Sequence, residues 1–269
     1  MPDFNRAEVI DPVIETQILK TLDQIEQDHD VKILHAAESG SRAWGFHSPN
    51  SDYDVRFMYV HKKDWYLSIY PGRDVIELPI NETYDVSGWD LKKTLHLAMK
   101  SNAVVMEWLQ SPIQYKSNPD FVNEMIAFCQ QSFDRKALMY HYLNLGIRDI
   151  DKTWRTSNET QIKKYFYILR PAIALRWLEC NADGFEALPM NVQALMEQSD
   201  VPEAVKSSIN ELIEQKRTKQ EKAMTEKIER LDEFALQQYE QTREQLEKMP
   251  KSPAKQINAA DQFFQKWLI

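Results

Sequence analysis

Residues 36–57 read Ala36-Ala37-Glu38-Ser39-Gly40-Ser41-Arg42-Ala43-Trp44-Gly45-Phe46-His47-Ser48-Pro49-Asn50-Ser51-Asp52-Tyr53-Asp54-Val55-Arg56-Phe57. Apolar runs at 31–37 and 55–60 predict a strand on either side of a Gly-Ser turn. Side chains alternate along a strand, so we expect Asp52 and Asp54 on one side of it. Two carboxylates on one face repel each other unless a cation lies between them, and oxygen ligands suit Mg²⁺. Gly40 permits a close backbone approach and turn N–H groups can hold phosphate oxygens, so the stretch indicates transfer onto or from a nucleotide.

Length and composition indicate a folded chain of one large or two modest domains. The chain has 269 residues, of which 43% are hydrophobic and 11% aromatic. This is ample for a core and argues against global disorder. The formal net charge of −8 argues against broad, sequence-independent nucleic-acid binding through a basic surface, although it leaves room for a local basic groove.

Cysteine usage and hydropathy indicate a cytoplasmic protein. Cys129 and Cys180 are far apart and lack metal-ligand spacing, so we expect two reduced, buried thiols. No apolar run approaches the ~18 residues of a membrane span, and the N-terminus lacks a basic-then-apolar signal peptide. We therefore expect no membrane partner.

The order of expected elements predicts an α+β fold in which a small mixed β-sheet precedes an all-helical C-terminal domain. Strands are expected at 31–37, 55–60, 74–80 and 83–87, with an optional edge piece at 112–115. Helical periodicity is seen at 12–28, from 89 to 109, at 121–133, 137–145, 162–178 and 192–196, and in two long helices within 202–247. Everything beyond about 118 is expected to be helical, so we place the domains at 1–117 and 118–269.

Three motifs carry a family resemblance. Gly40-Ser41, a short spacer and Asp52-Tyr53-Asp54 resemble the signature of the DNA polymerase β-like nucleotidyltransferase superfamily. The wordings Gly-Ser-Arg-Ala-Trp-Gly at 40–45, Asp-Val-Ser-Gly-Trp at 85–89 before Lys-Lys, and Lys-Lys-Tyr-Phe-Tyr-Ile-Leu-Arg-Pro at 163–171 are similar to a bacterial and phage nucleotidyltransferase family linked to RNA repair. The resemblance spans roughly residues 15 to 195.

The resemblance implies a metal site with three acids. Asp52 and Asp54 would ligate two Mg²⁺ ions, with Mn²⁺ as an alternative, for in-line displacement at the α-phosphorus. Asp85, Asp90 and Glu77 each lie between apolar neighbours and compete for the place of the third acid. Asp85 aligns best with the family pattern, whereas Asp90 immediately precedes a helix and is also explained as its N-cap. Glu77 is also explained as a solvent-facing strand residue.

Nucleotide-binding residues are expected in both halves. Ser41 would hydrogen-bond a phosphate beside Gly40, and Arg42 would reach the triphosphate or pair with one of the acids. Lys163, Tyr167 and Arg170 recur at helical spacing and share one face, which suits a helix lining a cleft.

On that helix, Lys163 or Lys164 would neutralise the leaving pyrophosphate, and Tyr167 or Tyr165 would stack on a base or ribose. An ordinary solvated face explains the same spacing. Pro171 should kink or end the helix. The basic run 216–219 is surrounded by glutamates and predicts a salt-bridged helix surface.

Together these features predict a nucleotidyltransferase that moves a nucleoside monophosphate from an NTP to an acceptor hydroxyl and releases pyrophosphate. An RNA end is the favoured acceptor, with a protein side chain or a small molecule as alternatives within the same chemistry. A non-catalytic nucleotide-binding or partner-binding module on the same fold is the hypothesis from another class. The base selected and the oligomeric state stay open.

Overall fold

A computed structural model describes residues 9–70, 72–81, 83–153, 159–181, 188–218, 223–251 and 256–269. The chain forms two compact units that alternate along the sequence. The first unit comprises 1–43, 52–133 and 254–269, and the second comprises 44–51 and 134–253. The units therefore do not correspond to a single cut between 117 and 118, because the segment 44–51 belongs with the later helices and the last helix belongs with the sheet.

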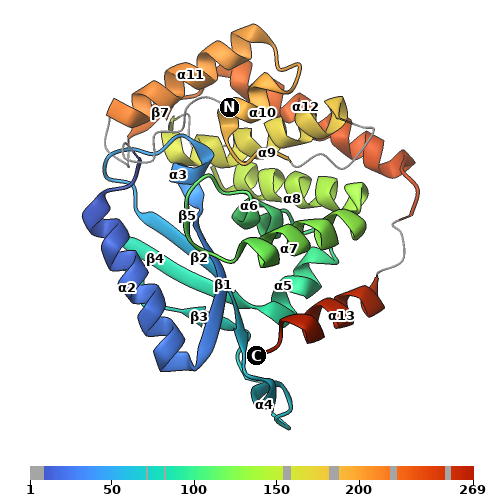
Figure 1. Cartoon of the computed structure of the whole chain (residues 1–269). Helices are drawn as coiled ribbons and strands as arrows, with labels where there is room; N and C mark the ends of the chain where they lie inside the picture. The colour runs from blue at the N-terminus through green and yellow to red at the C-terminus, as the bar shows by residue number, and fades with distance from the viewer. Residues whose placement is uncertain are drawn as a thin grey trace. The chain divides into compact units, whose positions relative to one another are not determined.

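Within the described residues, the first unit is built on a mixed sheet of five strands, which are labelled in Figure 1. The strands are β1 (Val31–Glu38), β2 (Tyr53–His61), β3 (Val75–Glu77), β4 (Tyr84–Asp90) and β5 (Gln114–Ser117). Their order is β3-β4-β2-β1-β5; β2 and β4 are parallel, and the other pairs are antiparallel. The strands expected at 74–80 and 83–87 are confirmed as the antiparallel neighbours β3 and β4, and the optional edge piece is confirmed as β5. Strand β4 continues to Asp90, beyond the expected end at 87.

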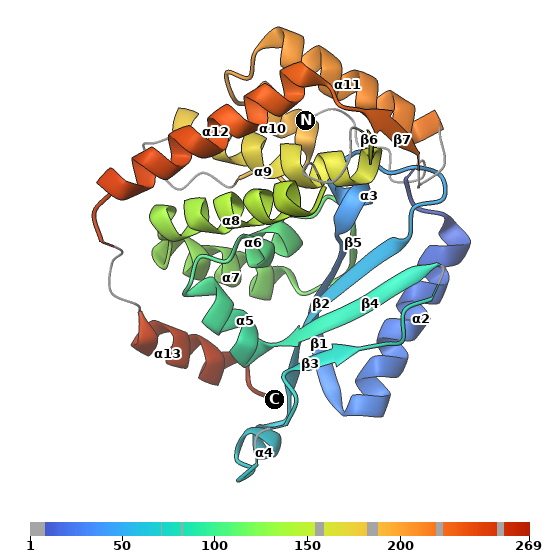
Figure 2. The ribbon, with the colours of Figure 1, turned by 180° about the vertical axis from the view of Figure 1, so that it is seen from behind.

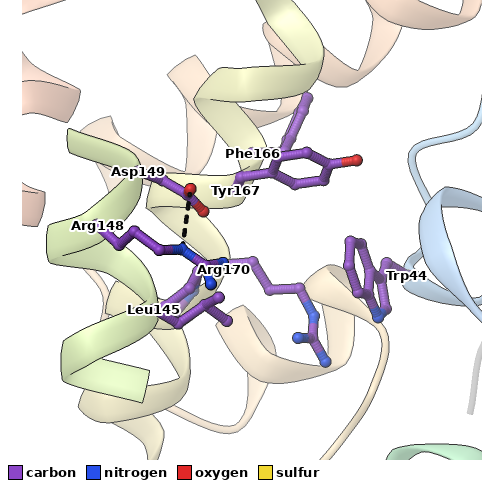
Figure 3. Close-up of a pocket in the computed structure, with 8 residues that line it drawn as sticks. Trp44, Leu145, Arg148, Asp149, Phe166, Tyr167 and Arg170 are labelled. Carbon is purple, nitrogen blue, oxygen red and sulfur yellow. Dashed lines mark ion pairs between the residues drawn. The ribbon is translucent and has the colours of Figure 1, made fainter. Parts of the chain in front are cut away.

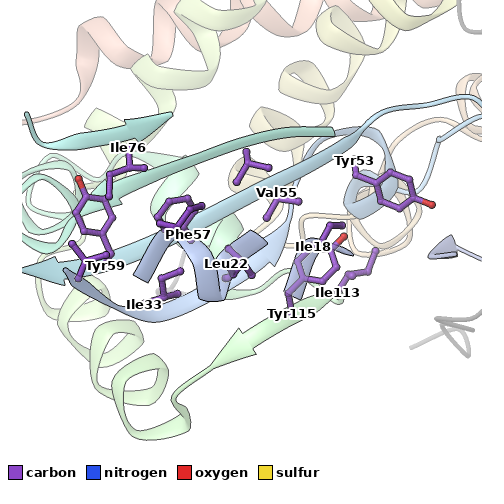
Figure 4. Packing of buried hydrophobic residues seen from close by; sticks show 14 of the residues in the cluster. Ile18, Leu22, Ile33, Tyr53, Val55, Phe57, Tyr59, Ile76, Ile113 and Tyr115 are labelled. Carbon is purple, nitrogen blue, oxygen red and sulfur yellow. The ribbon is translucent and has the colours of Figure 1, made fainter. Parts of the chain in front are cut away.

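One face of the sheet is covered by α2 (Pro12–His29). Asp11 caps this helix by accepting from the backbone N of Val13 at 2.7 Å, and Pro12 supplies the pre-set φ of a first turn. Asp30 ends the helix in the left-handed conformation. Ile18 and Leu22 of α2 pack against inward-facing strand residues of β1 and β2 (Figure 4), so this face forms a continuous apolar core.

The opposite face is covered by helices that come from both ends of the unit (Figure 2). They are α5 (Leu91–Ala98), α6 (Ala103–Leu109), α7 (Pro119–Gln131) and α13 (Ile257–Trp267). Helix α13 lies in the region expected to be helical, although the sequence analysis gave it no bounds. It is held by aromatic contacts, with Phe263 5.5 Å from Phe128 and Trp267 5.2 Å from Phe121 between ring centroids. Two short helices, α3 (Gly40–Trp44) and α4 (Lys63–Tyr66), complete the N-terminal half.

The second unit is helical around α9 (Ile162–Cys180). Its other helices are α8 (Arg135–Thr153), α10 (Val192–Glu197), α11 (Glu203–Thr218) and α12 (Glu229–Lys248). Expecting helix throughout this region was wrong at two places, because β6 (Glu159–Gln161) and β7 (Met224–Glu226) form an antiparallel pair. Pro171 lies inside α9 without ending it. In the run 216–219, Arg217 forms the expected ion pair with Glu214 on the exposed helix surface, whereas Lys216 is buried over the Phe46 ring.

The α+β fold class with a small mixed sheet is thus confirmed. None of the helices within the described ranges is long and apolar enough to cross a bilayer. Cys129 and Cys180 are both free thiols, as expected. The expected burial is confirmed for Cys129 and wrong for Cys180, which is exposed with Sγ 2.8 Å from an Asp200 carboxylate oxygen.

Candidate active site

Two of the three predicted acids meet on neighbouring strands. β2 and β4 run parallel, and their register sets Asp54 opposite Asp85. Paired residues on adjacent strands project to the same face, so both carboxylates emerge from one place on the sheet. The side chains are 23% and 25% exposed. Asp85 therefore has the position that a third acid needs, and its role stays a prediction.

Arg56 joins these two carboxylates. Its Nη2 donates to Asp85 Oδ2 at 2.7 Å and to Asp54 Oδ1 at 3.0 Å, and its Nη1 donates to the carbonyl of Asp85 at 2.8 Å. The guanidinium thus supplies the positive charge that two adjacent carboxylates require. Arg56 was not among the residues predicted for the site. The signal was present in the sequence, because Arg56 follows Asp54 by two positions and so shares its face of the strand.

Gly40 lies directly against the second acid. Its φ of +57° is in the left-handed region, and a Cβ added there would lie 1.8 Å from Asp54 Oδ2. The neighbouring Ser39 N–H donates to the carbonyl of Asp54 at 2.8 Å. A side chain at position 40 would therefore displace the Asp54 carboxylate. This close approach is the physical reason for glycine at this place in the motif.

Glu38 is a buried acid that the sequence interpretation did not select. It is fully buried at the end of β1, where Oε2 accepts from the Tyr115 hydroxyl at 2.6 Å and Oε1 accepts from the backbone N of Asp54 at 2.9 Å. Burial raises the pKa of Glu38 to about 7, against the opposing effect of the Tyr115 hydrogen bond. Glu38 therefore positions the backbone of Asp54. Its partner Tyr115 lies 77 positions away, so no local pattern predicts the contact.

Arg42 contacts the backbone on both sides of the motif. Nη1 donates to the carbonyl of Val9 at 2.7 Å and Nε donates to the carbonyl of Asp52 at 3.4 Å. Its guanidinium carbon lies 3.8 Å from the centre of the Tyr53 ring. Arg42 is buried and so is Ser41, while Asp52 is half-buried. These contacts hold the segment that carries Asp52 in place.

The competing acids have other partners. Asp90 caps α5 by accepting from the backbone N of Lys92 at 2.8 Å, and it also accepts from the Tyr66 hydroxyl at 2.5 Å. Its interpretation as an N-cap is confirmed. Glu77 is exposed and forms an ion pair with Arg73, as expected of a solvent-facing strand residue.

The donor set of the first unit fits a hard divalent cation in its chemistry. Asp52, Asp54 and Asp85 offer only carboxylate oxygens, which are ligands that Mg²⁺ accepts. In the described part of the chain, no group of three His, Cys, Asp or Glu side chains is arranged to hold a metal ion, and Arg56 forms ion pairs with two of these acids. A cation bound there would compete with Arg56 for the same oxygens.

The nucleotide-binding residues predicted in the second unit do not lie at one place. Tyr167 lines a pocket together with Trp44, Arg148 and Arg170 (Figure 3), whereas Lys163 and Lys164 are not part of its lining. Lys164 is exposed and Lys163 is half-buried on the first turn of α9.

Tyr165, the alternative to Tyr167 for stacking, is buried and donates to Asp232. It is therefore a core residue. Trp44 and Arg148 were not predicted, although Trp44 is part of the quoted motif.

Comparison with known proteins defines the family. A sequence model of the RlaP family, described as RNA repair pathway DNA polymerase beta family, matches residues 14–266. The chain is 42% identical over 221 residues to uncharacterized protein YcgL of Bacillus subtilis (strain 168), which covers 82% of this chain and 84% of the relative. The match extends beyond the motifs to α13, so the resemblance is confirmed over nearly the whole chain. The protein belongs to the RNA repair pathway DNA polymerase beta family.

Proposed function

We propose that this protein is a Mg²⁺-dependent nucleotidyltransferase that transfers a nucleoside monophosphate from an NTP to a hydroxyl at an RNA end. The observation that carries the proposal is the pairing of Asp54 with Asp85 on adjacent parallel strands, next to the Gly40 turn. Membership of a polymerase beta family supports nucleotidyl transfer, and the family's description supports RNA as the acceptor.

In this reaction the acceptor oxygen forms a bond to the α-phosphorus. The bond from that phosphorus to the oxygen bridging the β-phosphate breaks, so pyrophosphate leaves with the bonding electron pair. Bound Mg²⁺ supplies neutralisation of phosphate charge and a lowered pKa for the attacking hydroxyl. Asp52, Asp54 and Asp85 would hold the ion, and a carboxylate oxygen of Asp85 would alternatively accept the hydroxyl proton. Glu38 and Ser39 keep Asp54 in place by hydrogen-bonding its backbone on both sides.

The test is nucleotidyl transfer with purified full-length protein. Each α-³²P-labelled NTP is incubated with Mg²⁺ or Mn²⁺ and with total RNA, a protein lysate, a small-molecule pool or no acceptor. We expect label in RNA and loss of that label in an Asp52→Asn/Asp54→Asn double variant. The matched control is Glu77→Gln, which removes an exposed acid outside the site and should transfer like the wild type.

The acceptor pools separate the alternatives within the same chemistry. If label appears in the lysate proteins or in a small molecule and is lost in the double variant, that molecule and not RNA is the acceptor. Label that persists in the double variant would contradict the assignment of the acids.

A non-catalytic nucleotide-binding module is the second candidate, and the Arg56 ion pairs are the observation that favours it. Both Asp54 and Asp85 already bind a cation of the protein itself. Nucleotide binding measured by calorimetry, with no label in any pool, would support this module and would overturn the transferase proposal.

A further inference from the structure

The second unit contains a pocket between α8, α9 and the end of α3. Its volume is about 190 Å³, and its lining includes Trp44, Arg148, Asp149, Phe166, Tyr167 and Arg170. Figure 3 shows the side chain of Trp44, from α3, beside those of Tyr167 and Arg170, which both come from α9. The pocket thus combines aromatic rings with guanidinium groups.

The aromatic walls of the pocket contact each other and Arg170. The Trp44 and Tyr167 rings meet edge to face, with centroids 6.1 Å apart and an interplanar angle of 88°. Arg170 lies 4.5 Å from the centre of the Trp44 ring and donates from Nε to the carbonyl of Met190 at 3.3 Å. Arg170 is only 3% exposed, so its guanidinium is desolvated and its position is set before any ligand arrives.

Two further groups give the pocket its polarity. Arg148 is 60% exposed at the side chain and lies 3.7 Å from the Asp149 carboxylate, so it is positioned at the solvent side. Trp44 Nε1 is buried and has no hydrogen-bond partner within the described ranges. An indole N–H is a donor only, and a buried donor without an acceptor costs free energy. A ligand with acceptor atoms in a flat ring would offer it a partner.

Size and chemistry together define the ligand class. Pockets for drug-sized ligands have about 300–1,000 Å³, so this smaller pocket suits one ring system. Aromatic faces and arginine planes stack on nucleobases, and such stacking accepts any base. Two arginines against one aspartate leave a positive balance that suits an attached phosphate.

We infer that the Trp44–Tyr167–Arg170 pocket binds one unstacked nucleobase of a nucleotide. This deepens the proposed nucleotidyl transfer and rests on it for the identity of the nucleotide. The base belongs to the donor NTP or to a single-stranded RNA end, which offer the same chemistry. Trp44 is the last residue of α3, the helix that begins at Gly40, so the pocket and the Gly-Ser turn share one short element of the chain.

The test uses 2-aminopurine, whose fluorescence is quenched when it stacks. Full-length protein is titrated into 2-aminopurine ribonucleoside triphosphate, into single-stranded RNA ending in 2-aminopurine, and into a hairpin in which that base is paired. We expect quenching with the triphosphate or the single strand and none with the hairpin. Tyr167→Leu should weaken that binding about 5- to 150-fold, the loss expected for one base–aromatic stack.

Matched control variants distinguish the loss of base stacking from a general effect on folding. Tyr140→Leu removes an exposed tyrosine of α8 outside the pocket and should bind like the wild type. Tyr167→Phe keeps the ring and should also retain binding, and Arg148→Gln should weaken binding of the phosphate-bearing ligands. Trp44→Leu removes the other aromatic wall and should also weaken binding. If circular dichroism shows that Trp44→Leu disturbs the fold, the test is decided by the Tyr167 variants, because Tyr167 is only half-buried.

Each outcome decides the proposal. If Tyr167→Leu weakens binding of the triphosphate, the pocket holds the base of the donor NTP. If it weakens binding of single-stranded RNA, the pocket holds a base of the acceptor. Wild-type binding by Tyr167→Leu in both arms, or quenching by the paired hairpin alone, would overturn the pocket proposal. Binding is measured without turnover, so base binding with no label transfer retains the pocket and removes only the transferase proposal.

Discussion

The side chains around Asp54 depend on one another at the level of single residues. Gly40 leaves room for the carboxylate, Glu38 holds its backbone N–H, and Arg56 neutralises it together with Asp85. Removing Glu38 or Arg56 takes a hydrogen-bond partner from Asp54, and a side chain at position 40 would displace its carboxylate; each change costs free energy. The site is therefore sensitive to substitutions that do not touch Asp54 itself.

Arg56 gives a prediction that is independent of activity. Replacing it by Gln removes the cation that bridges the Asp54 and Asp85 carboxylates, so we expect a loss of about 1–3 kcal/mol in the free energy of unfolding. Added Mg²⁺ should then raise the melting temperature of Arg56→Gln more than that of the wild type, because the ion no longer competes with the guanidinium.

Thermal unfolding with and without MgCl₂ measures this difference. Arg73→Gln is the control, because its ion pair with Glu77 is exposed and worth little. An equal response of both variants to Mg²⁺ would contradict competition between Arg56 and the ion.

The sheet is joined to its covering helices by buried polar contacts as well as by apolar ones. His35 of β1 is fully buried, and its ring nitrogens lie 2.8 Å from the carbonyl of Trp108 in α6 and 3.3 Å from the hydroxyl of Ser117 in β5. The strand is thereby tied to a helix and to the edge strand at one residue. An imidazole in this place must stay neutral to stay buried.

This contact predicts a pH dependence of stability. Burial lowers the pKa of His35 from its usual 6.5. Just below pH 6.5, this imidazole therefore binds a proton in the unfolded chain more readily than in the folded chain. The stabilisation is complete above pH 6.5 and is lost as the pH falls below it, by up to about 1.4 kcal/mol per pH unit.

Urea unfolding of the wild type and of His35→Gln at pH 7.5 and pH 5.5 tests this. The wild type should lose more stability on acidification than the variant does. Equal losses would mean that His35 is protonated in the folded chain at the lower pH.

At the scale of the whole molecule, the chain passes from one unit to the other and back within the stretch from Gly40 to Asp54. Gly40 and Asp52 belong to the first unit, whereas residues 44–51 between them belong to the second. Phe46 is completely buried there and stacks on Phe166 of α9, with ring centroids 4.2 Å apart. The motif thus contributes core residues to both units.

Paired substitutions test this division. Phe46→Ala should cost about 3–5 kcal/mol and lower hydrogen-exchange protection in α9 while β1 and β2 stay protected. Phe57→Ala, which removes an equally buried ring from β2, should do the reverse. Hydrogen exchange followed by mass spectrometry reports both regions at once. If each variant opened both units to the same extent, the chain would unfold as a single cooperative unit.

Several features were predictable because their signals are local. The run around Gly40 and Asp54, the apolar strands and the cap at Asp90 follow from spacing, alternation and turn chemistry within a few residues. These signals are sufficient for the α+β class and for the family resemblance. The roles of Asp52, Asp54 and Asp85 as metal ligands remain predictions of the sequence.

Other features required residues that are distant in the chain. The packing position of helix α13 depends on rings of α7 more than a hundred positions earlier, and β6 pairs with β7 across more than sixty positions. The same holds for Tyr115 on Glu38 and for Trp44 beside Tyr167. Local patterns do not report such contacts.

The sequence by itself therefore determined the fold class, most of the longer helices and strands, and the family resemblance, because backbone preferences and motif spacing act over short distances. Only the tertiary structure decided that Arg56 bridges Asp54 and Asp85, that Glu38 is buried beside them, and that Trp44 completes a pocket with Tyr167. These arrangements depend on strand register and on packing between distant segments, which are set when the whole chain buries its apolar surface.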